Sequence, residues 1–147
     1  MSNEARLIPE GFVEMPNAKG FAKHVGPFYL KDLGGRRFTY GFVSKDHHEN
    51  PNDVLHGGML STFADHFLGH AVVYVTGRYC ATISLNTDYA AGGKVGRFIE
   101  GRAEIVRQTN SLMFMRGVVH DGDDILLNVN GVWRLFGEYA GAGSADR

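Results

Sequence analysis

The apolar positions of the chain change from a helical spacing to a strand-like spacing near residue 76. Between residues 56 and 75 they recur every three or four residues, the spacing of a helix with a wide buried face. These positions are Met59, Leu60, Phe63, Ala64, Phe67, Leu68, Ala71, Val72 and Val75. We therefore predict one long central helix.

Most of the remaining chain is typical of β-strands. Before the helix, residues 36–44 alternate aromatic and small side chains with a period of two. After Gly77, further strands are predicted over residues 81–89, 96–108, 112–120 and 124–135, with short turn sequences between them. Such short links predict an antiparallel meander.

This order of elements predicts an α+β fold in which a curved antiparallel sheet wraps one helix. A single sheet of this kind leaves its edge strands unpaired, so we expect a homo-oligomer, at least a dimer. Residues 34–136 form the predicted domain. Residues 1–33 are expected to be a partly ordered lead-in segment, and residues 137–147 a flexible tail.

Charge and composition limit the classes of partner. The 147 residues carry 15 Lys and Arg against 16 Asp and Glu, which does not favour binding to nucleic acid. No segment approaches the roughly 20 apolar residues of a membrane span, and the N-terminus has no signal-peptide pattern. The single cysteine, Cys80, cannot form an intrachain disulfide and fits a reducing compartment. We expect a cytoplasmic protein.

The start of the predicted helix carries the candidate chemistry. Gly57 and Gly58 allow a ligand to approach the backbone closely, and the first N–H groups of a helix have no partner within it. These donors lie at the positive end of the helix dipole, where a developing negative charge is stabilised. Asp65 follows about two turns later, away from the densest apolar stripe. The helix thus offers an oxyanion site and an acid, although a lone helix aspartate is more often a capping or salt-bridged residue than a catalyst.

A metal site is the weaker interpretation of the histidines near this helix. His66 and His70 have the i, i+4 spacing of paired helix ligands, and His47 and His48 precede them in a loop. No cysteine cluster or further helix ligand completes a set. We expect no metal site.

The set Asn50, Leu55-His56-Gly57-Gly58 and Asp65 has a distinctive spacing of loop, helix start and acid. Over about residues 34–136 the chain resembles the hotdog-fold acyl-CoA thioesterases, the superfamily of hydroxybenzoyl-CoA and phenylacetyl-CoA thioesterases. Relatives with a glutamate acid often have a hydroxyl residue one turn later. Gly69 stands there in this chain, so the resemblance is to the aspartate subgroup.

The resemblance implies hydrolysis of an acyl-CoA thioester to free acid and CoA, with no cofactor besides the CoA of the substrate. Asp65 would be the nucleophile or the general base, and the Gly57 N–H would donate to the thioester oxygen. The substrate would be held mainly by the neighbouring subunit of a dimer or a dimer of dimers.

The resemblance assigns supporting roles to several further residues. His56 and Asn50 would orient the thioester or the water, and Thr82 would place a hydroxyl beside the acid, with Ser84 as the competing candidate. Gly58, Lys94 and Arg97 would contact CoA, the last two through its phosphates. Many relatives have Pro-Ala-Lys at the turn where this chain has Ala91-Gly92-Gly93-Lys94, so the lysine is kept and the proline is lost.

Two other functions remain open from the sequence. A hotdog hydratase or dehydratase acting on acyl thioesters would also use an acid and a histidine, and His56 with Asp65 fits that pair. A non-catalytic acyl-CoA binding module would need the groove alone.

Overall fold

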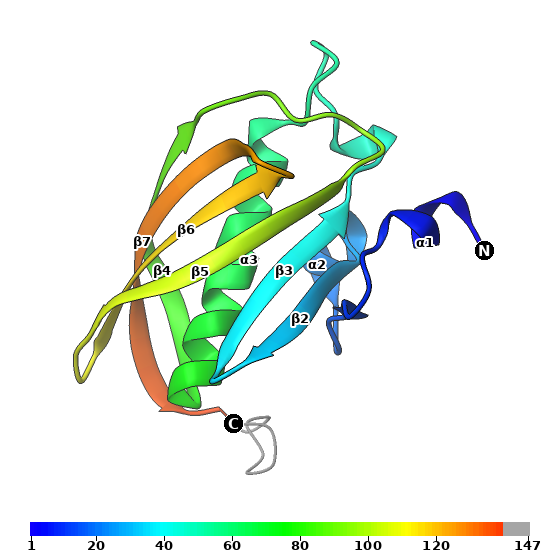
Figure 1. Cartoon of the computed structure of the whole chain (residues 1–147). Coiled ribbons are helices and arrows are strands. Elements are labelled where there is room, and N and C mark those ends of the chain that lie inside the picture. The colour runs from blue at the N-terminus through cyan, green and yellow to red at the C-terminus, as the bar shows by residue number, and fades with distance from the viewer. Residues whose placement is uncertain (140–147) are drawn as a thin grey trace.

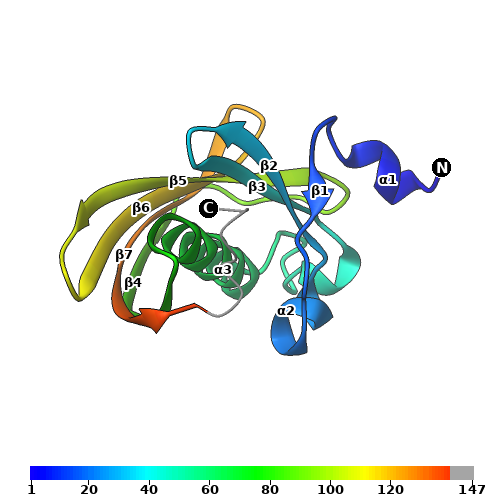
Figure 2. The same cartoon turned by 90° about the horizontal axis from the view of Figure 1, so that it is seen from below.

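The long apolar helix is α3 (Gly57–Thr76), and it lies against the concave face of a curved sheet (Figures 1 and 2). The computed structural model describes residues 1–139. All predicted apolar positions of the helix are buried except Val75, which is partly buried. The helix ends at Gly77, whose φ of 66° suits glycine at a helix C-terminus. No helix in residues 1–139 is long and apolar enough to cross a membrane.

The sheet contains seven strands in the order β1-β2-β3-β5-β6-β7-β4, and each neighbouring pair is antiparallel. Their bounds are β1 (Val13–Glu14), β2 (Phe28–Gly34), β3 (Arg37–Val43), β4 (Arg78–Tyr89), β5 (Phe98–Gln108), β6 (Leu112–Asp121) and β7 (Asp124–Glu138). Two short helices, α1 (Asn3–Leu7) and α2 (Gly20–Val25), and a 3₁₀ helix, η1 (Asp46–His48), precede α3. This is the predicted α+β hotdog arrangement.

The predicted four-strand meander is wrong in one respect, because β4 does not pair with β5. The helix carries the chain across the sheet, and β4 joins the far edge beside β7. The link after β4 then passes over the N-terminal end of α3 (Figure 1). Its backbone bonds the flanking segments, as in Leu55 N–H to Gly93 O and Ala90 N–H to Leu126 O, each at 2.9 Å. The turn-forming residues in this link therefore belong to a crossover connection between β4 and β5, and not to a hairpin.

The sheet extends into the segment that the sequence placed before the domain. β1 and β2 add two strands, and Met15 and Phe28 belong to the buried core. Prolines and scattered aromatics hide this strand pattern in the sequence. At the other end β7 continues to Glu138, so the predicted tail begins within a strand, and residues 140–147 lie outside the described part of the chain.

Large aromatic side chains fill the space between the helix and the sheet. Tyr40, Phe42, Phe63, Phe67 and Trp133 are all at most 1% exposed. A glycine in the sheet makes room for them: a Cβ at Gly101 would lie 2.5 Å from the Phe67 ring. The helix is therefore held at a fixed depth in the sheet, which places its polar face in a defined position.

Candidate active site

The first turn of α3 is built around His56. This residue is the N-cap, and its Nδ1 accepts the Gly58 N–H at 2.8 Å. Its backbone N–H donates to the His48 carbonyl, also at 2.8 Å. A Cβ at Gly58 would lie 2.9 Å from His56 Nδ1. A side chain at position 58 would therefore displace the His56 ring from its capping position.

Gly57 presents its backbone at the positive end of the helix dipole. A Cβ there would lie 2.9 Å from the Tyr89 ring, whose hydroxyl donates to the Gly57 carbonyl at 3.1 Å and lies 2.6 Å from Ser61 Oγ. Within residues 1–139 no acceptor faces the Gly57 N–H. A backbone N–H without a partner at a helix start can stabilise a negative charge, and the oxyanion role of Gly57 stays a prediction.

Asp65 lies beside a hydroxyl on β4. Thr82 Oγ1 donates to Asp65 Oδ1 at 2.6 Å, the short distance of a charge-assisted hydrogen bond. The contact follows from the topology, because pairing of β4 with β7 places Thr82 opposite the buried Trp133. Ser84 lies beyond an irregularity in the same strand and pairs with Val132. Of the two hydroxyl candidates, Thr82 is the one that contacts the acid.

A cavity of about 880 Å³ opens over the outward face of α3 next to this pair. We call it the α3 cavity. Its lining is mostly apolar and aromatic with several polar groups, and the residues are Met15, Pro16, Asn17, Leu30, Asp32, Phe38, Asp65, His66, Gly69, His70, Val73, Tyr74, Cys80, Thr82, Trp133 and Tyr139. Such a mixture is typical of sites for small organic ligands.

Asn50 uses its side-chain oxygen within its own loop. Oδ1 accepts the Asn52 N–H at 2.8 Å and the Val54 N–H at 3.3 Å. The Asn50 N–H also donates to the Val54 carbonyl at 2.8 Å. The residue therefore shapes the loop before α3, and its predicted contact with a substrate stays a prediction.

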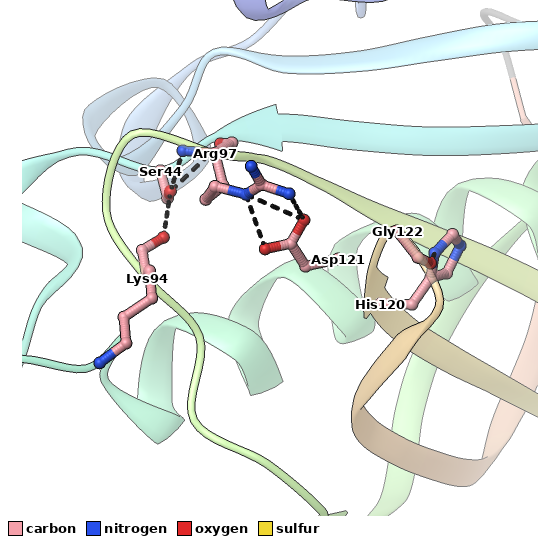
Figure 3. A network of polar contacts seen from close by, with 6 residues as sticks. All are labelled: Ser44, Lys94, Arg97, His120, Asp121 and Gly122. Atoms are coloured by element: carbon pink, nitrogen blue, oxygen red, sulfur yellow. Dashed lines mark hydrogen bonds and ion pairs between the residues drawn. The ribbon is translucent and has the colours of Figure 1, made fainter.

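Lys94 and Arg97 lie in the crossover, tied by backbone contacts to Ser44 (Figure 3). The Arg97 guanidinium forms a two-pronged ion pair with Asp121, with contacts between 2.8 and 3.2 Å. The Lys94 side chain extends away from this pair (Figure 3). In Figure 3 no interaction is drawn to the Lys94 ammonium group. A phosphate contact for either Lys94 or Arg97 stays a prediction.

His66 and His70 are held by aromatic contacts. The His66 ring lies 4.9 Å from the Phe28 ring, and His70 Nδ1 lies 2.9 Å from the buried Tyr40 hydroxyl. Within residues 1–139 no group of three or more His, Cys, Asp or Glu is arranged to hold a metal ion. The Tyr40–His70 pair was not anticipated from the sequence, because only the pairing of distant segments brings β3 to this face of α3.

Burial of neutral His70 makes the stability of the protein depend on pH. Burial, and then the nearby His66, lower the pKa of His70 from 6.5 to about 4. Between these two values the unfolded chain binds a proton that the folded chain does not, so the free energy of unfolding falls as the pH falls. We expect this group to contribute a loss of about 2 kcal/mol between pH 7.5 and pH 5.

Urea denaturation at the two pH values measures this loss. His70→Gln should reduce the difference between the two unfolding free energies, and the exposed control His24→Gln should leave it as in the parent protein. An equal pH dependence in the parent and in His70→Gln would contradict the assignment.

Comparison with known proteins agrees with this fold. The model of the thioesterase superfamily matches residues 52–127. A Pseudomonas aeruginosa protein named "Putative esterase PA0474" is 25% identical over 130 residues, which cover 87% of this chain and 97% of that protein.

Solved structures of low sequence identity share the fold. BH2602 from Bacillus halodurans, solved with CoA, gives a TM-score of 0.72 at 21% identity over 85% of this chain and 83% of that one. The PaaI protein of the Escherichia coli phenylacetic acid degradation operon gives 0.73 at 15% identity over 80% and 84%. The fold is thus the hotdog fold. The chain belongs to the thioesterase superfamily, and it is a thioester hydrolase.

Proposed function

We propose that the protein is an acyl-CoA thioesterase that hydrolyses an acyl-CoA to the free acid and CoA. The Asp65–Thr82 contact in the lining of the α3 cavity is the observation that carries this proposal. It places a carboxylate, fixed by a hydroxyl donor, beside a space suited to an acyl group. The CoA named in the BH2602 structure supports CoA as the thiol part of the substrate.

Asp65 acts on the thioester carbonyl in one of two ways. As general base it takes a proton from water, whose oxygen attacks the carbonyl carbon. As nucleophile it attacks that carbon itself, and water then hydrolyses the resulting anhydride. In both routes the carbonyl oxygen becomes negatively charged before the C–S bond breaks and CoA leaves as a thiolate. This thiolate takes back the proton that Asp65 removed from water in the first route, and takes a proton from solvent in the second.

The oxyanion donor in this proposal comes from a second copy of the chain. Gly57 and Asp65 are eight residues apart on one helix, which corresponds to about 12 Å along its axis. A single carbonyl group needs donor and attacking atom within about 3 Å each. One chain cannot supply both groups, whereas two helices side by side and antiparallel bring Gly57 of one near Asp65 of the other.

The β4 edge is suited to join the two copies. β4 is a sheet edge of 12 residues, and among residues 1–139 its backbone pairs with one strand only, β7. Its Ile83 and Tyr79 side chains are 59% and 45% exposed. Long edges with exposed apolar side chains usually pair with another strand. Thr82 lies on this edge, so pairing there would place the acid at the seam of a dimer.

A charge on this edge tests the dimer. We expect Ile83→Lys to shift the protein from dimer to monomer and to lower kcat/KM at least about 100-fold, because an oxyanion donor is lost with the partner. Light scattering at matched protein concentrations measures the mass. The control Ile125→Lys changes a 38% exposed side chain on β7 and should preserve both mass and activity. A fully active monomer would contradict the two-chain site.

Thiol release separates this function from its alternatives. A thioesterase releases CoA from saturated and unsaturated acyl-CoAs alike, and the new thiol reacts with a chromogenic disulfide. A hydratase would remove the enoyl absorbance of crotonyl-CoA without releasing thiol, and a binding module would give saturable binding and no product. Either of these outcomes would overturn the proposed function. His56 already uses Nδ1 as a helix cap, so it suits an orienting role better than proton transfer.

A further inference from the structure

A second pocket, of about 330 Å³, lies at the start of α3. We call it the α3-start pocket. His56 and Gly58, at the first turn of α3, line one side of it, and Phe21 and Val25 of α2 line another. The pocket therefore shares the first turn of α3 with Gly57, whose N–H is the oxyanion donor of the proposed function. The short helix α2 thus borders the oxyanion end of the site.

Residues 16–25, which contain α2 and which we call the cover, leave the core between two fixed ends. Met15 and Phe28 are buried, and the Met15 N–H donates to the Phe28 carbonyl at 2.8 Å. Between these ends α2 projects away from the sheet layer (Figure 2) and has no buried residue. Ala22 and Val25 pack partly against the core. A segment that is closed at its base and weakly packed along its length can move as a unit.

One hydrogen bond attaches the cover to another element. His48 of η1 donates from Nε2 to the Val25 carbonyl at 2.7 Å. Apart from the bonds within α2 and its cap, residues 1–139 contain no other hydrogen bond and no ion pair that involves the cover. The polar attachment of α2 therefore depends on one side chain.

The fold fixes the His48 ring for this contact. Nδ1 accepts the Lys45 N–H at 3.0 Å, so the ring proton is on Nε2, which faces the Val25 carbonyl. The ring meets the buried Phe42 ring edge-on at 5.3 Å. Burial lowers the pKa of His48 below its ordinary value of 6.5, so the ring is neutral at pH 7. The His48 carbonyl also accepts the N–H of His56, the N-cap of α3, at 2.8 Å.

Two positions before α2 have backbone angles that suit a hinge. Asn17 and Gly20 have φ values of 61° and 60°, in the left-handed region. A Cβ at Gly20 would meet nothing within 4 Å, so the space around this residue is open. A few residues at the end of an element can absorb the backbone rotation of a moving segment. Rotation at Gly20 would move α2 and leave the β1–β2 pairing in place.

We propose that the cover is a gate over the α3-start pocket, that a ligand reaches the first turn of α3 when the cover opens, and that His48 is the positioning residue that holds it closed. The inference rests on the proposed function for the identity of the ligand, an acyl-CoA. A ligand passes a gate on entry and on exit. A larger open population therefore raises the association and dissociation rate constants by the same factor and leaves Kd unchanged.

Three substitutions test the hydrogen bond and the hinge separately. His48→Asn keeps an acceptor for the Lys45 N–H and loses the donor to the Val25 carbonyl, whereas His48→Gln keeps a donor near the place of Nε2. Gly20→Ala leaves His48 unchanged and disfavours the closed backbone, because residues with a Cβ rarely adopt the left-handed region. His24→Asn, on the exposed side of α2, is the matched control.

Hydrogen–deuterium exchange of the full chain measures opening without any ligand. We expect the amides of residues 20–26 to exchange about fivefold faster in His48→Asn and in Gly20→Ala, the effect of one hydrogen bond or one disfavoured backbone angle. His48→Gln and His24→Asn should stay within about twofold of the parent protein. Exchange in α3 should be unchanged in all four variants.

Three results of this exchange measurement would overturn the inference. Unchanged exchange in both His48→Asn and Gly20→Ala would show that the cover does not open. A rise in His48→Gln as large as in His48→Asn would show that the bond to Val25 does not hold the cover closed. An equal rise in α3 would show a general loss of stability in place of a local opening.

Stopped-flow binding of S-hexyl-CoA, a non-hydrolysable thioether, tests the gate itself. Both rate constants should rise about fivefold in His48→Asn and in Gly20→Ala, with Kd within about twofold of the parent value. A merely structural defect would change Kd. An unchanged association rate constant in variants that exchange faster would overturn the gate.

The two measurements distinguish failure of the inference from failure of the function. If the parent protein releases no thiol from acyl-CoAs, the proposed function fails, and the exchange rates still decide whether His48 holds the cover closed. Hydrolysis of acyl-CoAs, together with association rate constants that are equal in the parent, His48→Asn and Gly20→Ala, would leave the function intact and overturn the gate alone.

Discussion

Asp65→Asn is expected to lower kcat for acyl-CoA hydrolysis about 1,000-fold, within the range typical for loss of a catalytic acid or base. An amide neither removes a proton from water nor attacks a carbonyl carbon. The Thr82 hydroxyl, now 2.6 Å from Asp65 Oδ1, can donate equally well to the amide oxygen. The substituted side chain should therefore keep its place, and KM should change little. Steady-state thiol release gives both constants.

A matched control separates loss of chemistry from loss of structure. Asp123→Asn makes the same change in the exposed turn between β6 and β7 and should leave kcat unchanged. Asp65→Asn should also keep the melting temperature of the parent protein within a few degrees. A kcat for Asp65→Asn within about threefold of the parent value would show that the carboxylate is not part of the chemistry.

The helix and most strands could be predicted because their apolar periods differ. The 3.6-residue period from Met59 to Val72 identified α3, whose buried face is the predicted one. Strand order was harder, since a turn sequence shows where the chain bends and not which strands then pair. The Ala91-Gly92-Gly93 stretch was interpreted as a hairpin, but its backbone bonds the segment before α3.

The candidate site was predictable where its residues lie close in sequence. His56, Gly57 and Asp65 all belong to α3 or its cap, so the helix alone fixes their relation. The resemblance placed the hydroxyl at Thr82 with Ser84 as the competing candidate, and the structure shows the contact with Asp65 at Thr82. An irregularity in the β4–β7 pairing lies between these two residues, and it could not be predicted from the sequence. The α3 cavity could not be foreseen at all. It depends on side chains from β2, β3, β4 and β7 that meet only in the folded chain.

Gly57→Val is expected to lower kcat/KM at least about 100-fold, the usual cost of losing one oxyanion donor. Even a Cβ at this position would lie 2.9 Å from the Tyr89 ring, and the branched side chain would displace the first turn of α3 or the ring. Tyr89 is 55% exposed, so the ring can move and the fold should persist. Thiol release measures the activity, and circular dichroism the fold. Tyr89→Phe is the control, since it removes the hydroxyl while keeping the ring.

Mixing the two inactive variants tests directly whether each site takes its acid and its oxyanion donor from different chains. Asp65→Asn and Gly57→Val, unfolded together at equal concentrations and refolded, should form mixed dimers in which one of two sites has both groups intact. Random pairing then predicts recovery of about a quarter of the parent activity. Each variant refolded alone should stay inactive. No activity from refolded mixed dimers that are shown to form would contradict a site shared between two chains.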